Sequence, residues 1–156
     1  MIPYRDLIFG SLAFPTSTFV FAFFWGIYFY DRELVYPTYV EPFIPKWMNY
    51  GMHTVILPLV LLEIFVTPQR YPSMGKSLVI LGAAALCYQV WILYIYAKTE
   101  KWVYPVFEIL SPLSKIVFGG IAAIILFFCY MIGRFLHLMI WGDTVVMLDV
   151  YKKKSK

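Results

Sequence analysis

Charged residues are scarce in this sequence. They make up 14% of its 156 residues, whereas soluble domains contain about 25%. Hydrophobic residues account for 62% of the chain, against about 45–50% in soluble domains. A soluble domain of this size has too little polar surface to cover so many apolar side chains. The composition therefore excludes an ordinary soluble domain and indicates a protein that is surrounded by lipid.

Cysteine and histidine are also rare, with two residues of each. Cys87 and Cys129 both lie inside apolar runs, which favours buried thiols over a disulfide framework or a zinc site. The short motifs that mark metalloproteases, phosphate-binding loops and serine hydrolases do not occur. We therefore expect no metal and no cofactor.

Long apolar runs are abundant, by contrast. Four of them cover most of the chain, at about 7–30, 49–67, 77–97 and 116–141. About 20 residues suffice to span a bilayer as a helix, and a helix satisfies all its backbone polar groups internally. We predict an all-α, multi-pass transmembrane bundle of four helices, forming one domain over 1–156 with a basic tail at 142–156. Pro15 and Pro58 lie inside two runs and are expected to kink them.

The formal net charge of +4 is concentrated at the ends of the runs and in the tail. This distribution is typical of contact with membrane lipids and argues against nucleic-acid binding. If the runs alternate across the membrane, one side carries seven basic residues and the other carries five. The difference favours cytoplasmic N and C termini.

The last four residues, Lys153 to Lys156, have the Lys-Lys-x-x form of a retrieval signal for the endoplasmic reticulum. An ordinary basic tail explains them equally well. We expect an integral protein of the endomembrane system, with the endoplasmic reticulum first, or of the plasma membrane. Two loops between runs, 30–47 and 102–105, are rich in aromatic residues and proline, and anchoring at the membrane interface is the simplest interpretation of them.

Ionisable residues at membrane depth are candidate functional groups. The first is His53, which lies one turn inside the second run and four residues after Asn49, so that the two share a helix face. The Asn49 amide could fix the tautomer of the imidazole, as a general base requires. The alternative is an interfacial histidine that makes one structural hydrogen bond.

The other three such residues are Glu63, Arg134 and His137. We predict a structural ion pair between Glu63 and Arg134 that joins the second and fourth helices. His137 shares a face with Arg134, and both residues could instead reach the inner interface. Because His53 and His137 lie near opposite membrane surfaces, roughly 20 Å apart, they cannot ligate one haem or metal together.

Three segments resemble the signatures of a known family. They are Phe24–Pro37, Phe43–Thr54 with the following Leu57-Pro58, and Trp102–Glu108. The resemblance is to the androgen-induced proteins, a family that includes the androgen-dependent regulator of tissue factor pathway inhibitor. It extends in order over nearly the whole chain. It implies a six-helix membrane protein, of which this chain has the last four helices.

The resemblance also implies an activity, the hydrolysis of fatty acid esters of hydroxy fatty acids by a threonine nucleophile and a histidine base. The histidine falls on His53, which would take the proton of the threonine before an acyl-enzyme forms and is cleaved by water. The threonine belongs to the family's first helix. We therefore expect this chain to be a shortened form or a fragment that is catalytically incomplete. Tyr50 stands where the family is expected to have another histidine.

No threonine of the chain is a convincing replacement. Thr16 and Thr18 lie deeper in the membrane than His53, and Thr54 points about 100° away from it around the helix. Arg32 is the nearest candidate for binding the carboxylate of a fatty-ester substrate, with surface anchoring as the alternative. The leading hypothesis is thus a lipid-ester hydrolase that lacks its nucleophile.

The second hypothesis belongs to a different class. It is a non-enzymatic multi-pass membrane protein that regulates other membrane or secreted proteins, through a partner that the sequence does not identify. A transporter is disfavoured because internal repeats, which are typical of transporters, are absent from the sequence.

Overall fold

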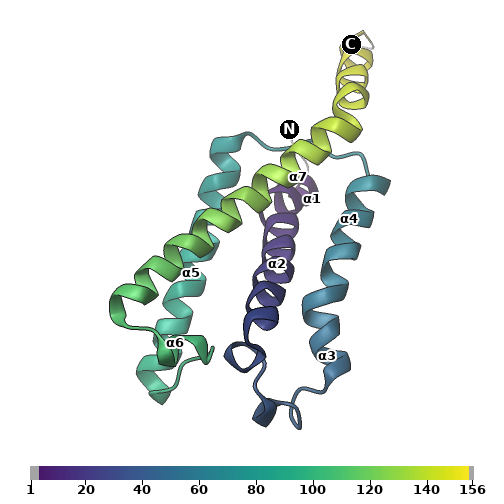
Figure 1. Cartoon of the computed structure of the whole chain (residues 1–156). Coiled ribbons are helices and arrows are strands. Elements are labelled where there is room, and N and C mark those ends of the chain that lie inside the picture. Colours follow the sequence, from purple (N-terminus) through teal and green to yellow (C-terminus); the bar gives the residue numbers. More distant parts are fainter. Residues whose placement is uncertain (1–3, 155–156) are drawn as a thin grey trace.

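The computed structural model describes residues 4–154, which contain helices and turns and no strand (Figure 1). Four helical segments are long and apolar enough to cross a membrane: Tyr4–Tyr30, Lys46–Val66, Met74–Thr99 and Pro112–Gly142. The predicted four-helix membrane bundle is confirmed. Each segment begins three or four residues before the predicted run, because first turns contain polar residues and proline, which an apolar pattern does not reveal.

The first two segments are interrupted by π-helical turns. The first consists of α1 (Tyr4–Ile8), η1 (Phe9–Ala13) and α2 (Phe14–Tyr30), and the second of α3 (Lys46–Tyr50), η4 (Gly51–Val55) and α4 (Ile56–Val66). Both π turns, η1 and η4, come shortly before the prolines that were expected to kink these helices. A proline ring clashes with the backbone one turn earlier, and a widened turn relieves the clash.

The turn η1 leaves one backbone carbonyl without a helical donor. The N–H of Phe14 reaches back five residues to the carbonyl of Phe9. With the same five-residue spacing, the carbonyl of Gly10 would be paired with the nitrogen of Pro15. That nitrogen has no hydrogen to donate. The hydroxyl of Tyr71 donates to this carbonyl at 3.1 Å. A side chain from a distant loop thus replaces the missing helical hydrogen bond.

The second half of the chain has longer helices. They are α5 (Met74–Thr99), the short α6 (Val106–Ile109) and α7 (Pro112–Lys154), while two 3-10 turns, η2 (Arg32–Leu34) and η3 (Thr38–Val40), lie in the earlier loop. Glu100 ends α5 in the left-handed conformation, with φ of 58°. The helix α7 has 43 residues and extends to Lys154, into the segment 142–156 that the sequence suggested as a basic tail, whose last two residues lie outside the described part.

The helix α2 lies at the centre of the bundle (Figure 1). It packs against α4 on one side and against α7, which crosses it diagonally, while η1 packs against α5. Phe9, Phe14 and Ile64 form a buried cluster, and Leu136 and Ile140 of α7 pack against it. The first, second and fourth membrane segments are therefore joined by one apolar core.

The two ends of the bundle differ. One end, here called the loop end, carries the connections over residues 31–45 and 100–111. At the other, here called the terminal end, α1 begins, the loop of residues 67–73 joins α4 to α5, and α7 extends beyond the bundle (Figure 1). Each end has one histidine, and the two histidines have different surroundings.

Candidate functional site

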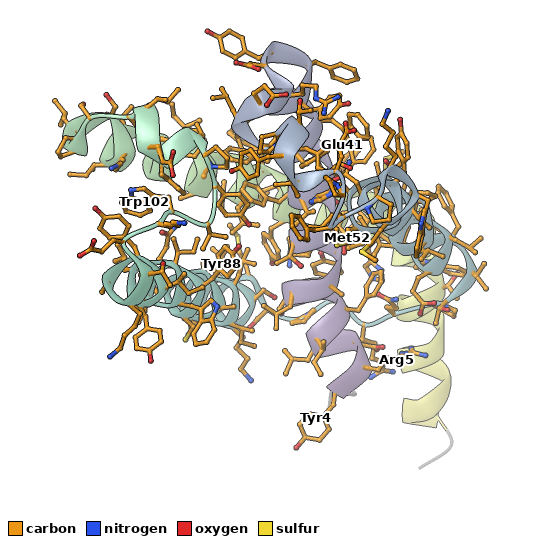
Figure 2. The ribbon with its side chains drawn as sticks, turned by 90° about the horizontal axis from the view of Figure 1, so that it is seen from below. Tyr4, Arg5, Glu41, Met52, Tyr88 and Trp102 are labelled. Carbon is orange, nitrogen blue, oxygen red and sulfur yellow. The ribbon has the colours of Figure 1, made fainter. Side chains whose placement is uncertain are left out.

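A cavity of about 210 Å³ lies at the loop end. Its wall comes from Phe24 of α2, the loop that contains Tyr36, the second membrane segment with Asn49 and His53, and the loop that contains Tyr104. Figure 2 looks onto this end of the bundle, with Tyr88 and Trp102 on the α5 side and Glu41 and Met52 on the side of α3 and α4. Four parts of the chain thus surround one space, and the last of them is distant from the others in the sequence.

His53 has a defined orientation in this wall. Its Nδ1 lies 3.1 Å from the backbone carbonyl oxygen of Asn49. A carbonyl oxygen can only accept, so Nδ1 carries the hydrogen and Nε2 carries the lone pair. The sequence suggested the side-chain amide of Asn49 for this role, and the structure gives it to the backbone carbonyl of the same residue. An imidazole with a free Nε2 is in the state that a general base needs.

Aromatic packing holds the imidazole ring. The rings of His53 and Phe24 are stacked with centroids 3.7 Å apart and an angle of 11° between their planes. The indole nitrogen of Trp25 donates to the hydroxyl of Thr54 at 3.2 Å. These two contacts attach the turn η4 to α2, so the imidazole can turn little without separating the two helices.

The threonines considered as replacement nucleophiles bond elsewhere. Thr16 and Thr18 donate to the carbonyls of Leu12 and Phe14 in their own helix, at 2.6 and 2.9 Å. Thr54 accepts from the indole of Trp25. Among the described residues that line the cavity there is no serine, threonine or cysteine. The hydroxyl groups in its wall are those of tyrosines.

Two tyrosines in the wall have hydrogen-bonded hydroxyls. The hydroxyl of Tyr36 donates to the carbonyl of Ile44 at 2.5 Å, and the hydroxyls of Tyr88 and Tyr104 lie 2.5 Å apart. Burial raises the pKa of Tyr104. Burial likewise raises the pKa of Tyr36. Both phenols therefore stay protonated. Sequence reasoning missed them because tyrosine near a membrane surface suggests anchoring.

Arg32 lies beside the cavity and does not line it. Its guanidinium pairs with Glu41 at 2.5 Å and with Glu33 at 3.4 Å, and lies over the ring of Tyr36. The hydrogen bond with Glu41 raises the pKa of Arg32. The residue that the sequence suggested for a substrate carboxylate is thus already balanced by two carboxylates. It ties the loop over residues 31–45 together.

The structure does not bring Glu63 and Arg134 together. Arg134 donates from Nη1 to the carbonyl of Pro72 at 3.3 Å and lies over the ring of Tyr71, 6.0 Å from its centre. The ion pair predicted from the sequence is therefore not formed among the described residues. Arg134 faces the loop of residues 67–73, and this direction depends on how α7 crosses the bundle, which sequence spacing does not reveal.

His137 lies in the same region and is 3% exposed. Its ring is 5.1 Å from that of Tyr71, and the ring of Tyr130 is 6.0 Å from Tyr71 on the same side. Within the described part of the chain, Nδ1 of His137 and the hydroxyl of Tyr130 have no hydrogen-bond partner. We call Tyr71, Tyr130, Arg134 and His137 the Tyr71 cluster. His137 is packed inside the protein, contrary to the suggestion that it reaches an interface.

The side chains that the structure describes contain no group of three or more His, Cys, Asp or Glu that could hold a metal ion. The polar side chains in the described wall of the cavity are the imidazole of His53, tyrosine hydroxyls and the Asn49 amide.

Comparison with known proteins identifies the family. The model of the FAR-17a/AIG1-like protein family matches residues 1–138. The chain belongs to this family. The resemblance inferred from the three segments is thereby confirmed, and in this family member those segments supply Phe24, His53 and Tyr104 to the wall of one cavity.

The chain is also similar to individual proteins over most of its length. The chain is 43% identical over 149 residues to the androgen-dependent TFPI-regulating protein of Mesocricetus auratus, covering 96% of this chain and 64% of the relative. It is 39% identical over 156 residues to the androgen-induced gene 1 protein of Homo sapiens, covering 100% and 65%. A membrane protein of Schizosaccharomyces pombe is 31% identical over 126 residues, covering 79% and 56%. The chain thus spans less than two thirds of the length of these relatives. No solved structure matches it.

Proposed function

We propose that the cavity around His53 binds the ester group of a lipid, and that His53 is the general base of a membrane-embedded ester hydrolase. The observation that carries the proposal is the orientation of His53, whose Nδ1 is bound to the Asn49 carbonyl in the wall of an aromatic cavity. The four membrane segments around it favour a substrate whose acyl tails remain in hydrocarbon. A fatty acid ester of a hydroxy fatty acid has this chemistry.

The reaction is acyl transfer to a hydroxyl nucleophile. Nε2 of His53 takes the hydroxyl proton as the oxygen attacks the ester carbonyl carbon, and returns it to the departing alcohol. Water then attacks the acyl-enzyme, with His53 again taking a proton, and releases the fatty acid. The nucleophile of this scheme is a threonine outside the described wall of the cavity. Because the described wall of the cavity provides no serine, threonine or cysteine, we expect these 156 residues to bind the ester without hydrolysing it.

A binding and turnover experiment tests the proposal. The chain is reconstituted in lipid nanodiscs with a fluorescent fatty ester, and binding and product release are measured. We expect saturable binding that weakens in His53→Ala, with no product. Fusion of the segment that precedes the alignment in a relative should restore turnover, and His53→Ala should abolish it. A fusion that remains active without His53 would falsify its role as base, and turnover by the chain alone would show that a nucleophile is present.

The alternative function is non-enzymatic regulation of other membrane or secreted proteins. It is favoured by the cavity wall, whose described residues provide no serine, threonine or cysteine, and by the name of the Mesocricetus auratus relative, which calls it a regulating protein. The two functions are distinguished by measuring, in cells, whether His53→Ala changes the effect of the chain on the regulated protein. A regulator that does not use the cavity should be unaffected.

We also propose that the terminal end faces the cytoplasm in a membrane of the endomembrane system. The excess of basic residues on that side supports this orientation. Glycan acceptors inserted near Pro42 and Pro105 at the loop end should be modified in cells, and one near Pro72 should not. The reverse pattern would invert the orientation.

A further inference from the structure

The loop end contains a pair of tyrosine hydroxyls that the proposed reaction has not yet used. Tyr104 lines the His53 cavity, and its hydroxyl lies 2.5 Å from that of Tyr88 on α5. A hydrogen bond between two hydroxyls uses one of their two protons. One of the two tyrosines therefore keeps a proton that it can donate elsewhere.

The surroundings decide which tyrosine keeps it. Tyr88 is 48% exposed and lies 11 residues before Thr99, the last residue of α5, or about 16 Å along the helix. At that depth the exposed surface meets lipid tails, which offer no acceptor. A hydroxyl in hydrocarbon is stabilised when its proton goes to a protein acceptor, which favours Tyr88 as the donor and Tyr104 as the acceptor of this hydrogen bond.

In that arrangement the proton of Tyr104 is available to an acceptor in the cavity that Tyr104 lines. A hydroxyl that accepts a hydrogen bond becomes a stronger donor, because successive hydrogen bonds polarise one another. The raised pKa of Tyr104 keeps its proton in place. The described wall of the cavity contains no lysine or arginine, and the hydroxyl of Tyr36 is already bonded to the carbonyl of Ile44. The Asn49 amide and the hydroxyl of Tyr39 are the competing donors in the described wall.

We propose that Tyr104 donates a hydrogen bond to the carbonyl oxygen of the bound lipid ester, and that Tyr88 is the residue that positions it. The inference rests on the proposed function and names the group that holds the reacting carbonyl. As a nucleophile adds to the ester, negative charge develops on this oxygen, and a donor already directed at it stabilises the charge. The polarised pair of phenols would do what an oxyanion hole does, with His53 as the base in the same cavity.

Two probes of matched shape separate carbonyl recognition from packing. The full chain in nanodiscs is titrated with a fluorescent fatty ester and with the corresponding ether, which lacks the carbonyl. We expect the wild-type chain to prefer the ester by roughly 2- to 12-fold, the range of one net hydrogen bond. Tyr104→Phe should abolish this preference while leaving the affinity for the ether unchanged.

Two further variants test the pair itself. Tyr88→Phe should reduce the preference for the ester in part, because Tyr104 keeps its hydroxyl and loses its partner. Tyr94→Phe is the matched control on α5: its ring stacks on that of Trp91 and lies near the ammonium of Lys98. It should leave both affinities unchanged.

The outcomes are distinguishable. If Tyr104→Phe lowers the affinities for ester and ether equally, Tyr104 only shapes the cavity and the inference is wrong. If it keeps the ester preference while Asn49→Ala loses it, the amide is the donor and the inference is also wrong. A wild-type chain that binds neither probe would overturn the proposed function and this inference with it.

Discussion

The two ends of this bundle contain similar residues and turns, but the surroundings of those residues differ. Each has one histidine, a π turn that precedes a proline, and tyrosines with buried rings. At the loop end, His53 is half-buried, hydrogen-bonded at Nδ1 and part of a cavity wall. At the terminal end, His137 is buried and Nδ1 has no partner among the described residues. The loop end thus surrounds a cavity, whereas the histidine of the terminal end is packed in the protein interior.

The tyrosines show the same contrast. The hydroxyl of Tyr71 completes the backbone of η1 by donating to Gly10, so its hydrogen-bonding capacity serves the fold. Burial raises the pKa of Tyr71, which keeps it a neutral donor. The hydroxyl of Tyr104 bonds to that of Tyr88, and this pair has one proton more than the hydrogen bond between them uses. A polar group becomes functional when the fold leaves part of its hydrogen-bonding capacity unused next to a cavity.

Chemical labelling of the histidines should show the largest difference between the ends. We expect diethyl pyrocarbonate, which acylates unprotonated imidazole nitrogens, to modify His53 in the folded chain and to leave His137, which is 3% exposed, unmodified. Mass spectrometry of the digested protein measures both sites. Denatured protein is the control, in which the two should react alike. Equal labelling of the folded chain would show that the terminal end opens to the solvent.

A methyl group added at the terminal end should cause the largest loss of stability. In Gly133→Ala the new Cβ would lie 2.4 Å from Cδ1 of Phe14, whose ring is 1% exposed and cannot move away, and 3.0 Å from the hydroxyl of Tyr71. Overpacking of this kind costs about 1–3 kcal/mol. The measurement is the thermal unfolding midpoint in one detergent, which we expect to fall.

Gly119→Ala is the matched control for that change. It lies on the same helix, and its added Cβ would have no neighbour within 4 Å. Because alanine favours a helix over glycine, its midpoint should stay the same or rise. If the two variants unfold alike, α7 does not pack against α2 as closely as the structure indicates.

Removal of single hydroxyls should have an effect of similar or smaller size. Tyr71→Phe leaves the carbonyl of Gly10 without its donor, and an unsatisfied buried group costs about 1–3 kcal/mol. Tyr130→Phe removes a hydroxyl that has no partner in the described structure, so stability should be unchanged or slightly higher. The thermal unfolding midpoints of the two variants measure this difference in stability. A loss in Tyr130→Phe as large as in Tyr71→Phe would reveal a partner, such as a buried water.

The sequence predicts some of these features and cannot predict others. The four helices can be predicted from the lengths of the apolar runs. His53 can be named as a candidate functional group from its depth in the membrane and its spacing from Asn49. The partner of Arg134 does not follow, because it depends on the crossing of α7 over the loop of residues 67–73. The Tyr88–Tyr104 pair joins a helix to a loop, and nothing in local periodicity distinguishes such tyrosines from interfacial anchors.

The smallest effect on stability is expected at the loop end itself. Glu41→Gln removes the ion pair with Arg32, which is only partly shielded from solvent. Partly exposed pairs contribute little, because water and salt screen the attraction and two long side chains lose freedom in forming it. Glu33 remains beside the guanidinium in this variant. The unfolding midpoint should therefore hardly change, and any change should disappear in high salt. A loss comparable to that of Tyr71→Phe would mean that the loop over the cavity, like the terminal end, stabilises the fold.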